Sequence, residues 1–156
     1  MKELRAEIRI GASADRVWAV LTDFAAYPEW NPFVPRIEGE PRVGARCRVT
    51  IRPPGARAMT FRPTVLVADP PSELRWLGRL GLPGIFDGEH SLQGVSLEDG
   101  AVLFVQRERF TGWLVPLLGG ALEKTLAGFE AMNRALKERA ESRPLLTARG
   151  ARGGRR

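Results

Sequence analysis

The last third of the sequence predicts one long amphipathic helix that begins near Trp113. Large apolar residues recur there with a period close to 3.6, and most charged residues fall off this stripe. At about 1.5 Å per residue, a helix of about 25 residues extends roughly 40 Å and can cross a whole β-sheet. Its apolar side needs such a sheet as a partner. The positions on the stripe are Leu114, Leu118, Leu122, Leu126, Phe129, Met132 and Leu136.

The sequence before this helix predicts short antiparallel strands and two short helices. Residues 3–10 alternate between charged and apolar side chains, which is typical of a strand with one buried face. Ser13 is a favourable N-cap for a helix over 14–22, and a second helical turn is expected over 25–30. Six further strands are expected over 34–40, 45–52, 61–67, 74–80, 85–97 and 101–111, separated by turn residues. The pattern predicts an α+β fold in which a seven-stranded antiparallel sheet is covered by the C-terminal helix.

The charge distribution separates a nearly neutral domain from a basic end. The length of 156 residues suits one domain. Five of the 24 basic residues lie within 143–156, where no acidic residue occurs, and this leaves 19 basic and 18 acidic residues elsewhere. No basic strand face with interleaved aromatics is present, so no nucleic-acid partner is expected. We expect a folded domain over 1–141 and a flexible Arg/Gly-rich tail over 142–156.

Several other classes of protein are disfavoured by the sequence. The longest apolar run, near 113–118, is far shorter than the roughly 20 residues that span a bilayer. No apolar block of a secretory signal occurs near the N-terminus, so a cytoplasmic location is expected. Cys47 is the only cysteine and His90 the only histidine, and we expect neither a disulfide nor a metal site. No phosphate-binding or dinucleotide motif is present, and no cofactor is expected. The oligomeric state stays open.

The connection over 27–34 has the sequence YPEWNPFV and is unusually apolar for a turn. Its prolines favour extended backbone. We interpret Trp30 and Phe33 as side chains that turn inward, so that this corner helps to close one end of a binding cavity.

The order of the elements and three motifs resemble the START-like, Bet v 1-like superfamily, and within it the polyketide cyclase/dehydrase group. The motifs are YPEWNPFV, Gly88-Glu89-His90, and the run ERFTG over 108–112. The resemblance covers residues 2 to about 140 and implies a helix-grip fold, in which a curved sheet wraps around the long helix with an apolar cavity between them. Members of this group bind lipids, sterols, plant metabolites or aromatic polyketides, and some catalyse cyclisation.

Glu108 is the leading candidate for chemistry. On the last strand, Phe104, Gln106 and Glu108 share a parity that is otherwise apolar, and they are predicted to face inward. A carboxyl group in an apolar cavity has a raised pKa, which suits acid–base work. The alternative is that Glu108 pairs with an arginine or with backbone donors. The other expected ligand contacts, each of which could instead be core, are Trp30, Asn31, Phe33, Trp76, Leu118 and Leu122, while Trp113 and the Tyr27 hydroxyl are expected near the cavity.

The position of His90 relative to Glu108 depends on the hairpin register. A two-residue turn at Asp99 and Gly100 would place His90 opposite Arg109, whereas a three-residue loop over 98–100 would place it opposite Glu108. A bulge expected at Gly94, together with the resemblance, favours the inward orientation. His90 could then act as an acid or base, or as a hydrogen-bonded structural residue.

Three functional hypotheses follow. The first is a protein that binds a small hydrophobic molecule between sheet and helix. The second is a cyclase or dehydratase that uses Glu108 or His90 as the acid or base. The third is a module that binds another protein. The sequence does not identify the ligand, because an apolar lining selects weakly among apolar molecules.

Overall fold

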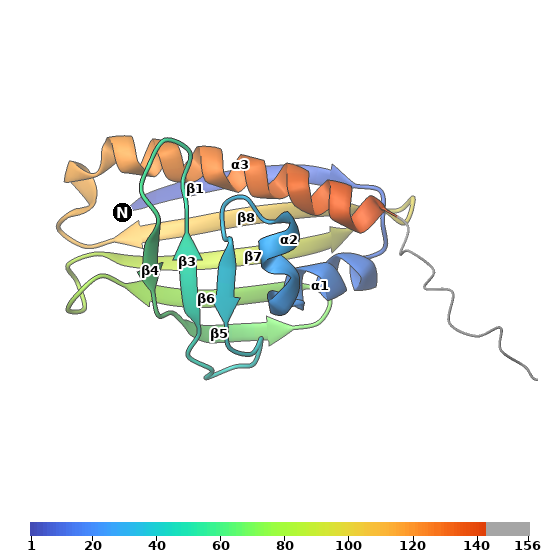
Figure 1. The fold of residues 1–156 in the computed structure, drawn as a ribbon, viewed down its shortest axis with the longest axis horizontal. Helices are drawn as coiled ribbons and strands as arrows, with labels where there is room; N and C mark the ends of the chain where they lie inside the picture. The colour runs from blue at the N-terminus through green and yellow to red at the C-terminus, as the bar shows by residue number, and fades with distance from the viewer. Residues whose placement is uncertain (143–156) are drawn as a thin grey trace, which may run out of the picture.

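A five-stranded antiparallel sheet forms the body of the computed structural model, which describes residues 1–142 (Figure 1). The strand order is β1-β8-β7-β6-β5, so the first and last strands of the chain are neighbours. Each pair of neighbouring strands is antiparallel. The strands are β1 (Lys2–Ile10), β5 (Thr64–Asp69), β6 (Glu73–Arg79), β7 (Asp87–Ser96) and β8 (Val102–Thr111).

The prediction of seven strands in one sheet is wrong, because residues 1–142 contain eight strands in two sheets. The expected strand over 61–67 is interrupted at Pro63, which has no N–H to donate to a strand ladder. The two sheets remain joined by backbone hydrogen bonds, since Gly44 N donates to Val65 O and Cys47 N donates to Pro63 O, both at 2.9 Å. The smaller sheet consists of β2 (Arg36–Glu38), β3 (Arg48–Ile51) and β4 (Met59–Phe61).

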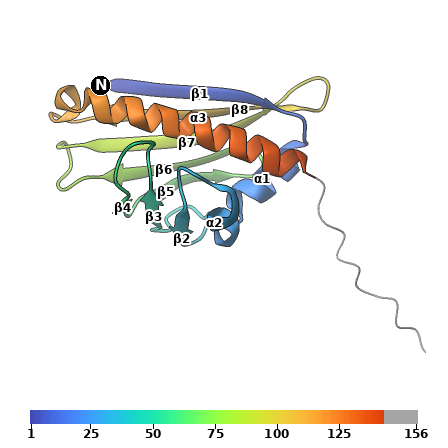
Figure 2. The same cartoon turned by 45° about the horizontal axis from the view of Figure 1, so that its top comes forward.

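The long helix α3 (Gly119–Glu141) lies along one face of the larger sheet, and the smaller sheet stands beside it on the same face (Figure 2). The predicted apolar stripe is confirmed where α3 meets the sheet, because Leu122, Phe129, Met132 and Leu136 are buried. The core therefore lies between the larger sheet, α3 and the smaller sheet. The α+β architecture with a long C-terminal helix is thus confirmed.

The expected start of this helix at Trp113 is wrong, since α3 begins at Gly119. The preceding residues form a connection with a short 3₁₀ turn, η2 (Val115–Leu117). Trp113 N donates to Gly84 O and Leu114 N donates to Ile85 O, both at 3.2 Å. These bonds tie the connection to the β6–β7 loop, so the chain cannot continue from β8 directly into a helix.

Three short helical segments lie at the end of the larger sheet opposite the β6–β7 loop (Figure 1). They are α1 (Ala14–Thr22), η1 (Phe24–Ala26) and α2 (Tyr27–Trp30). The Ser13 hydroxyl accepts a hydrogen bond from Arg16 N at 3.2 Å, and this confirms Ser13 as the N-cap of α1. The Arg16 guanidinium donates to the carbonyls of Arg139 and Ala140 at 3.3 Å. A cation at these last carbonyls is favourable, and it fastens α1 to the C-terminal end of α3.

The predicted tail lies outside the described residues, apart from Ser142. Among residues 1–142, no helix is long and apolar enough to cross a membrane.

Candidate functional site

The inward face of the larger sheet carries one row of side chains that contains Glu108 and His90. Leu4 on β1 lies opposite Glu108, Glu108 lies opposite His90, and His90 lies opposite Trp76. The hairpin loop has the three-residue form, because Leu97 N donates to Ala101 O at 2.8 Å. His90 and Glu108 are therefore direct neighbours on one face. The predicted bulge at Gly94 is wrong, since β7 and β8 pair without a register shift.

A buried polar cluster connects β7, β8 and α3. His90 Nε2 and Gln106 Oε1 are 3.0 Å apart, and Gln106 Nε2 donates to Asn133 Oδ1 at 2.6 Å and to Phe129 O at 3.4 Å. Because the Gln106 amide nitrogen faces α3, its oxygen accepts from His90 Nε2–H. This tautomer leaves the lone pair of His90 on Nδ1.

The His90 ring is enclosed by aromatic side chains. It stacks on Phe129 with ring centres 4.8 Å apart, and Trp76 contacts it edge-on at 5.4 Å. Burial lowers the pKa of His90 to about 4, although the hydrogen bond with Gln106 opposes this shift. The imidazole is therefore neutral at physiological pH.

The Glu108 carboxyl group has no hydrogen-bond or ion-pair partner within residues 1–142, so neither an arginine nor a backbone donor pairs with it there. Its Oε1 lies over the backbone of Gly88, where a Cβ atom would come within 2.6 Å of it. Although part of the side chain is accessible, burial of the carboxyl group raises the pKa of Glu108 to about 8. The group is mostly protonated at neutral pH and is therefore able to donate a hydrogen bond.

Glu108 and His90 are adjacent without bonding to each other. The His90 Nε2–H is used by Gln106, and no hydrogen bond within the described chain joins His90 Nδ1 to the Glu108 carboxyl group. A neutral acid and a neutral base thus lie side by side on an inward surface. Such a pair can donate to one oxygen of a bound molecule and accept a proton from a neighbouring atom.

The other residues predicted for the site divide into three groups. Trp76, Phe104 and Leu122 are buried in the core, and Leu118 packs against it. Asn31 is buried, and its Oδ1 accepts from the backbone N–H groups of Phe33 and Val34 at 3.1 and 2.8 Å, so it shapes the turn. Trp30 lies partly buried, and its indole N–H finds no partner among residues 1–142.

Two aromatic residues do not lie where they were expected. The side chain of Trp113 is 66% exposed at the far end of the sheet. Tyr27 is fully buried, and its hydroxyl donates to Leu21 O at 2.5 Å, so it cannot orient a ligand at the mouth of a cavity. In both cases the backbone path, rather than the residue type, decides the environment.

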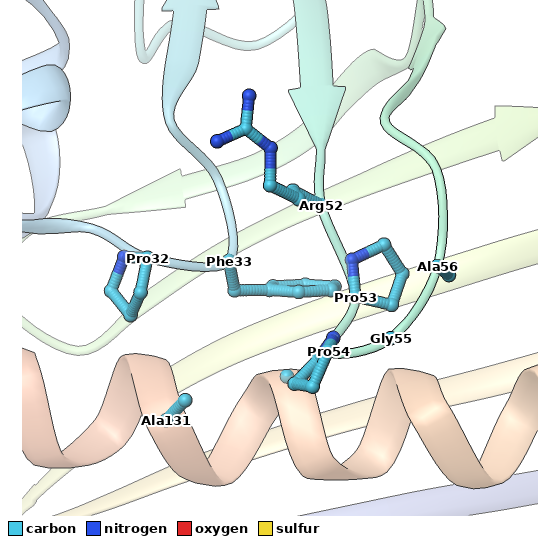
Figure 3. Close-up of a pocket in the computed structure, with 9 residues that line it drawn as sticks. Pro32, Phe33, Arg52, Pro53, Pro54, Gly55, Ala56 and Ala131 are labelled. Carbon is cyan, nitrogen blue, oxygen red and sulfur yellow. The ribbon is translucent and has the colours of Figure 1, made fainter.

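A pocket of about 240 Å³ lies between α3 and the loops that lead to and from the smaller sheet (Figure 3). The Phe33 side chain forms one wall, whereas the Arg52 guanidinium points away from α3. Phe33 is the only lining residue that the sequence singled out. The proline-rich run PPG over 53–55 was a signal for a rigid loop here, but its position against α3 could not be read from the sequence. The lining consists of Pro32, Phe33, Arg52, Pro53, Pro54, Gly55, Ala56, Gly128 and Ala131.

Phe33 separates this pocket from the polar cluster. Its ring packs directly on Gly128 of α3, where a Cβ atom would come within 2.2 Å of the ring. On the inner side, Phe33 contacts Phe129 edge-on with ring centres 5.5 Å apart, and Phe129 stacks on His90. A continuous line of aromatic contacts therefore leads from the pocket to His90. The sequence did not reveal Phe129 and Asn133 as site residues, because Phe129 lies on the apolar stripe like any core residue and Asn133 has no distinctive spacing.

The chain matches one known protein family. The family described as polyketide cyclase / dehydrase and lipid transport has a model that matches residues 1–141. No curated protein matches the chain.

Several solved structures share the fold. A START superfamily protein from Mycobacterium smegmatis has a TM-score of 0.68 at 23% identity, with 89% of this chain and 97% of that chain covered. The Zhui aromatase/cyclase from Streptomyces sp. R1128 has a TM-score of 0.70 at 19% identity, with 90% and 93% covered. The di-domain aromatase/cyclase StfQ from the steffimycin biosynthetic pathway has a TM-score of 0.70 at 18% identity. There, 89% of this chain matches, but only 50% of that chain.

The contact between Phe33 and Gly128 gives a test of this geometry. Gly128→Ala is expected to destabilise the protein by about 1–3 kcal/mol through overpacking, although alanine favours a helix. Phe33→Leu should recover much of this loss when combined with Gly128→Ala, because it removes the ring that the new methyl group meets. Urea denaturation of the two single variants and the double variant measures this coupling.

Gly120→Ala is the matched control, because nothing lies within 4 Å of a Cβ atom at that helical position. It should leave the stability unchanged or raise it. Equal effects of the two alanine substitutions, or strictly additive effects of Gly128→Ala and Phe33→Leu, would contradict the described contact.

Proposed function

The chain belongs to the polyketide cyclase/dehydrase and lipid transport family, and on this basis we propose that it binds a small hydrophobic molecule that carries a carbonyl or hydroxyl oxygen. The proposed site lies between the larger sheet and α3. The Glu108 carboxyl group is the polar anchor in this proposal, and the apolar side chains around it provide most of the binding energy.

The unpartnered Glu108 carboxyl group is the observation that carries this proposal. The Glu108 side chain is partly accessible and has no protein partner among residues 1–142, so its carboxyl group is free to bond to an oxygen of a molecule that enters this face. With its pKa raised to about 8, the carboxyl group donates a hydrogen bond at neutral pH and would repel an anionic head group only above that pH. A neutral oxygen on an otherwise apolar molecule is therefore the best-matched ligand group.

We propose that the ligand reaches this site past Phe33. The pocket in Figure 3 would be the outer end of the path, and the contacts from Phe33 to Phe129 and from Phe129 to His90 would line its inner part. Movement of the Phe33 ring would join the pocket to the interior. Trp30, Asn31, Trp76, Phe104, Leu118 and Leu122 remain predicted contributors to the walls of this site.

A pair of ligands of nearly equal size tests the role of Glu108. The protein is expected to bind 2-acetylnaphthalene more tightly than 2-ethylnaphthalene, because only the ketone accepts a hydrogen bond. The preference should be about tenfold and should fall as the pH rises through about 8, where the carboxyl group loses its proton. Quenching of tryptophan fluorescence on titration measures both affinities.

Glu108→Leu should remove the preference while retaining the affinity for 2-ethylnaphthalene, and Glu108→Gln should retain a donor and lose the pH dependence. Glu138→Gln, the same kind of change at an exposed position of α3, serves as the control and should match the parent chain. Failure to bind either naphthalene, or a ketone preference that survives Glu108→Leu, would refute the proposal.

The neighbouring position of His90 supports a second candidate function, a cyclase or dehydratase. In this scheme His90 Nδ1 takes a proton from a carbon atom next to a carbonyl group, and the Glu108 carboxyl group donates to the developing enolate oxygen. Gln106 and Asn133 would hold the imidazole in the required tautomer. The third hypothesis, a module that binds another protein, stays a prediction without a specific observation in its favour.

The effect of a His90 substitution on turnover distinguishes the enzyme hypothesis from the binding hypothesis. If the protein is an enzyme, His90→Phe should lower turnover of a poly-β-ketone substrate by about 100-fold or more while the substrate still binds. A binding protein would show no turnover in the parent chain, and the substitution would change only the affinity. Product formation in a single-turnover assay, with binding measured in parallel, distinguishes these outcomes.

A further inference from the structure

Four large apolar side chains are exposed together at the end of the molecule opposite α1. Leu80 and Leu82 on the β6–β7 loop are 57% and 72% exposed, and Trp113 and Leu117 on the β8–α3 connection are 66% and 74% exposed. Both views show these two loops projecting at the same end of the larger sheet (Figures 1 and 2). We call residues 80–86 and 112–118 the apolar tip.

Backbone contacts hold the two loops of the apolar tip together. Trp113 N donates to Gly84 O and Leu114 N donates to Ile85 O, as described above. Gly112 lies so close to Ile85 O that a Cβ atom would come within 2.3 Å of it, and its φ of 120° also favours glycine. At the base of the tip, Phe86 stacks on Phe110 of β8 with ring centres 5.3 Å apart. The exposed leucines and Trp113 therefore stand on a fixed base.

The apolar tip contains no charged residue, although 27% of the chain is charged. The charged side chains begin at its edges and include both signs, with a small excess of basic residues. Insertion of the tip into an apolar medium would therefore remove no charge from water, and the edge would remain in contact with water or polar head groups. The flanking residues are Lys2, Arg79, Arg109 and Lys124, and Glu3, Asp87 and Glu123.

We propose that the apolar tip docks on a phospholipid bilayer by shallow insertion of these four side chains into the interface. Tryptophan is enriched at the boundary between head groups and acyl chains, and leucine gains free energy on leaving water there. Two projecting loop tips suit a soft bilayer better than a protein partner, because a standard protein interface uses roughly 20 to 30 residues on each side. Because the basic and acidic residues at the edge of the tip nearly balance, apolar insertion contributes more to the binding free energy than attraction to anionic lipid.

The docked orientation would bring the inner site close to the bilayer. Phe110 lies directly behind the apolar tip and opposite Gly88, and Gly88 is the residue over which the Glu108 carboxyl group lies. Docking on the bilayer does not require that the protein binds the proposed ligand, because it depends only on the exposed side chains of the apolar tip.

Vesicles of phosphatidylcholine alone test this proposal with the full chain. Their neutral surface avoids electrostatic attraction to the five arginines of residues 143–156. The protein should sediment with these vesicles, and its tryptophan emission should shift to shorter wavelength. Leu82→Ser combined with Leu117→Ser should weaken this binding at least tenfold, and Trp113→Phe should retain most of the binding while the emission shift is lost.

Val43→Ser combined with Val95→Ser is the matched control, because these side chains are 57% and 51% exposed away from the apolar tip. It should change vesicle binding by less than twofold, and raising the salt concentration should have little effect. Three results would overturn the proposal: no binding to these vesicles, equal losses in the two double variants, or self-association that Leu82→Ser with Leu117→Ser abolishes in the absence of vesicle binding.

Discussion

The register of the β7–β8 hairpin is the constraint on which the site depends. The loop over 98–100 is stabilised by Asp99, whose Oδ1 accepts from Ala101 N at 3.0 Å, and by Gly100, whose φ is 83°. Side chains alternate between the two faces of a strand, so a slip of one residue would turn Glu108 or His90 outward. The turn thus determines whether His90 and Glu108 share a surface, although it lies eight residues from each of them in the sequence.

Much of the fold could be predicted from the sequence, because periodicity records which face of each element is buried. The stripe from Leu122 to Leu136, the first strand and the N-cap Ser13 follow from such local patterns. The errors arose where a single residue or a tertiary contact overrides the pattern. Pro63 divides an otherwise regular strand, and the hydrogen bonds of Trp113 and Leu114 with the β6–β7 loop delay the start of α3.

The candidate site could be predicted only in part for a related reason. Strand parity is sufficient to place Gln106 and Glu108 on the inward face, but it does not reveal their partners. Asn133 was missed because an asparagine on a buried helix stripe has no distinctive spacing, and its role emerges only when α3 is placed over β8. The wall formed by Phe33 and Gly128 likewise depends on the close approach of two segments far apart in the sequence.

The inward surface carries two neighbouring polar groups that differ in their hydrogen bonding. His90 is satisfied through Gln106 and Asn133 and is held neutral, whereas the Glu108 carboxyl group is left without a partner in the described chain. A carbon-13 NMR titration of the Glu108 side-chain carboxyl group tests this asymmetry most directly, with Glu108→Gln used for assignment. We predict a pKa of about 8 for this group. A value near the ordinary glutamate pKa of about 4.3 would show a solvated or paired carboxylate and would refute the asymmetry.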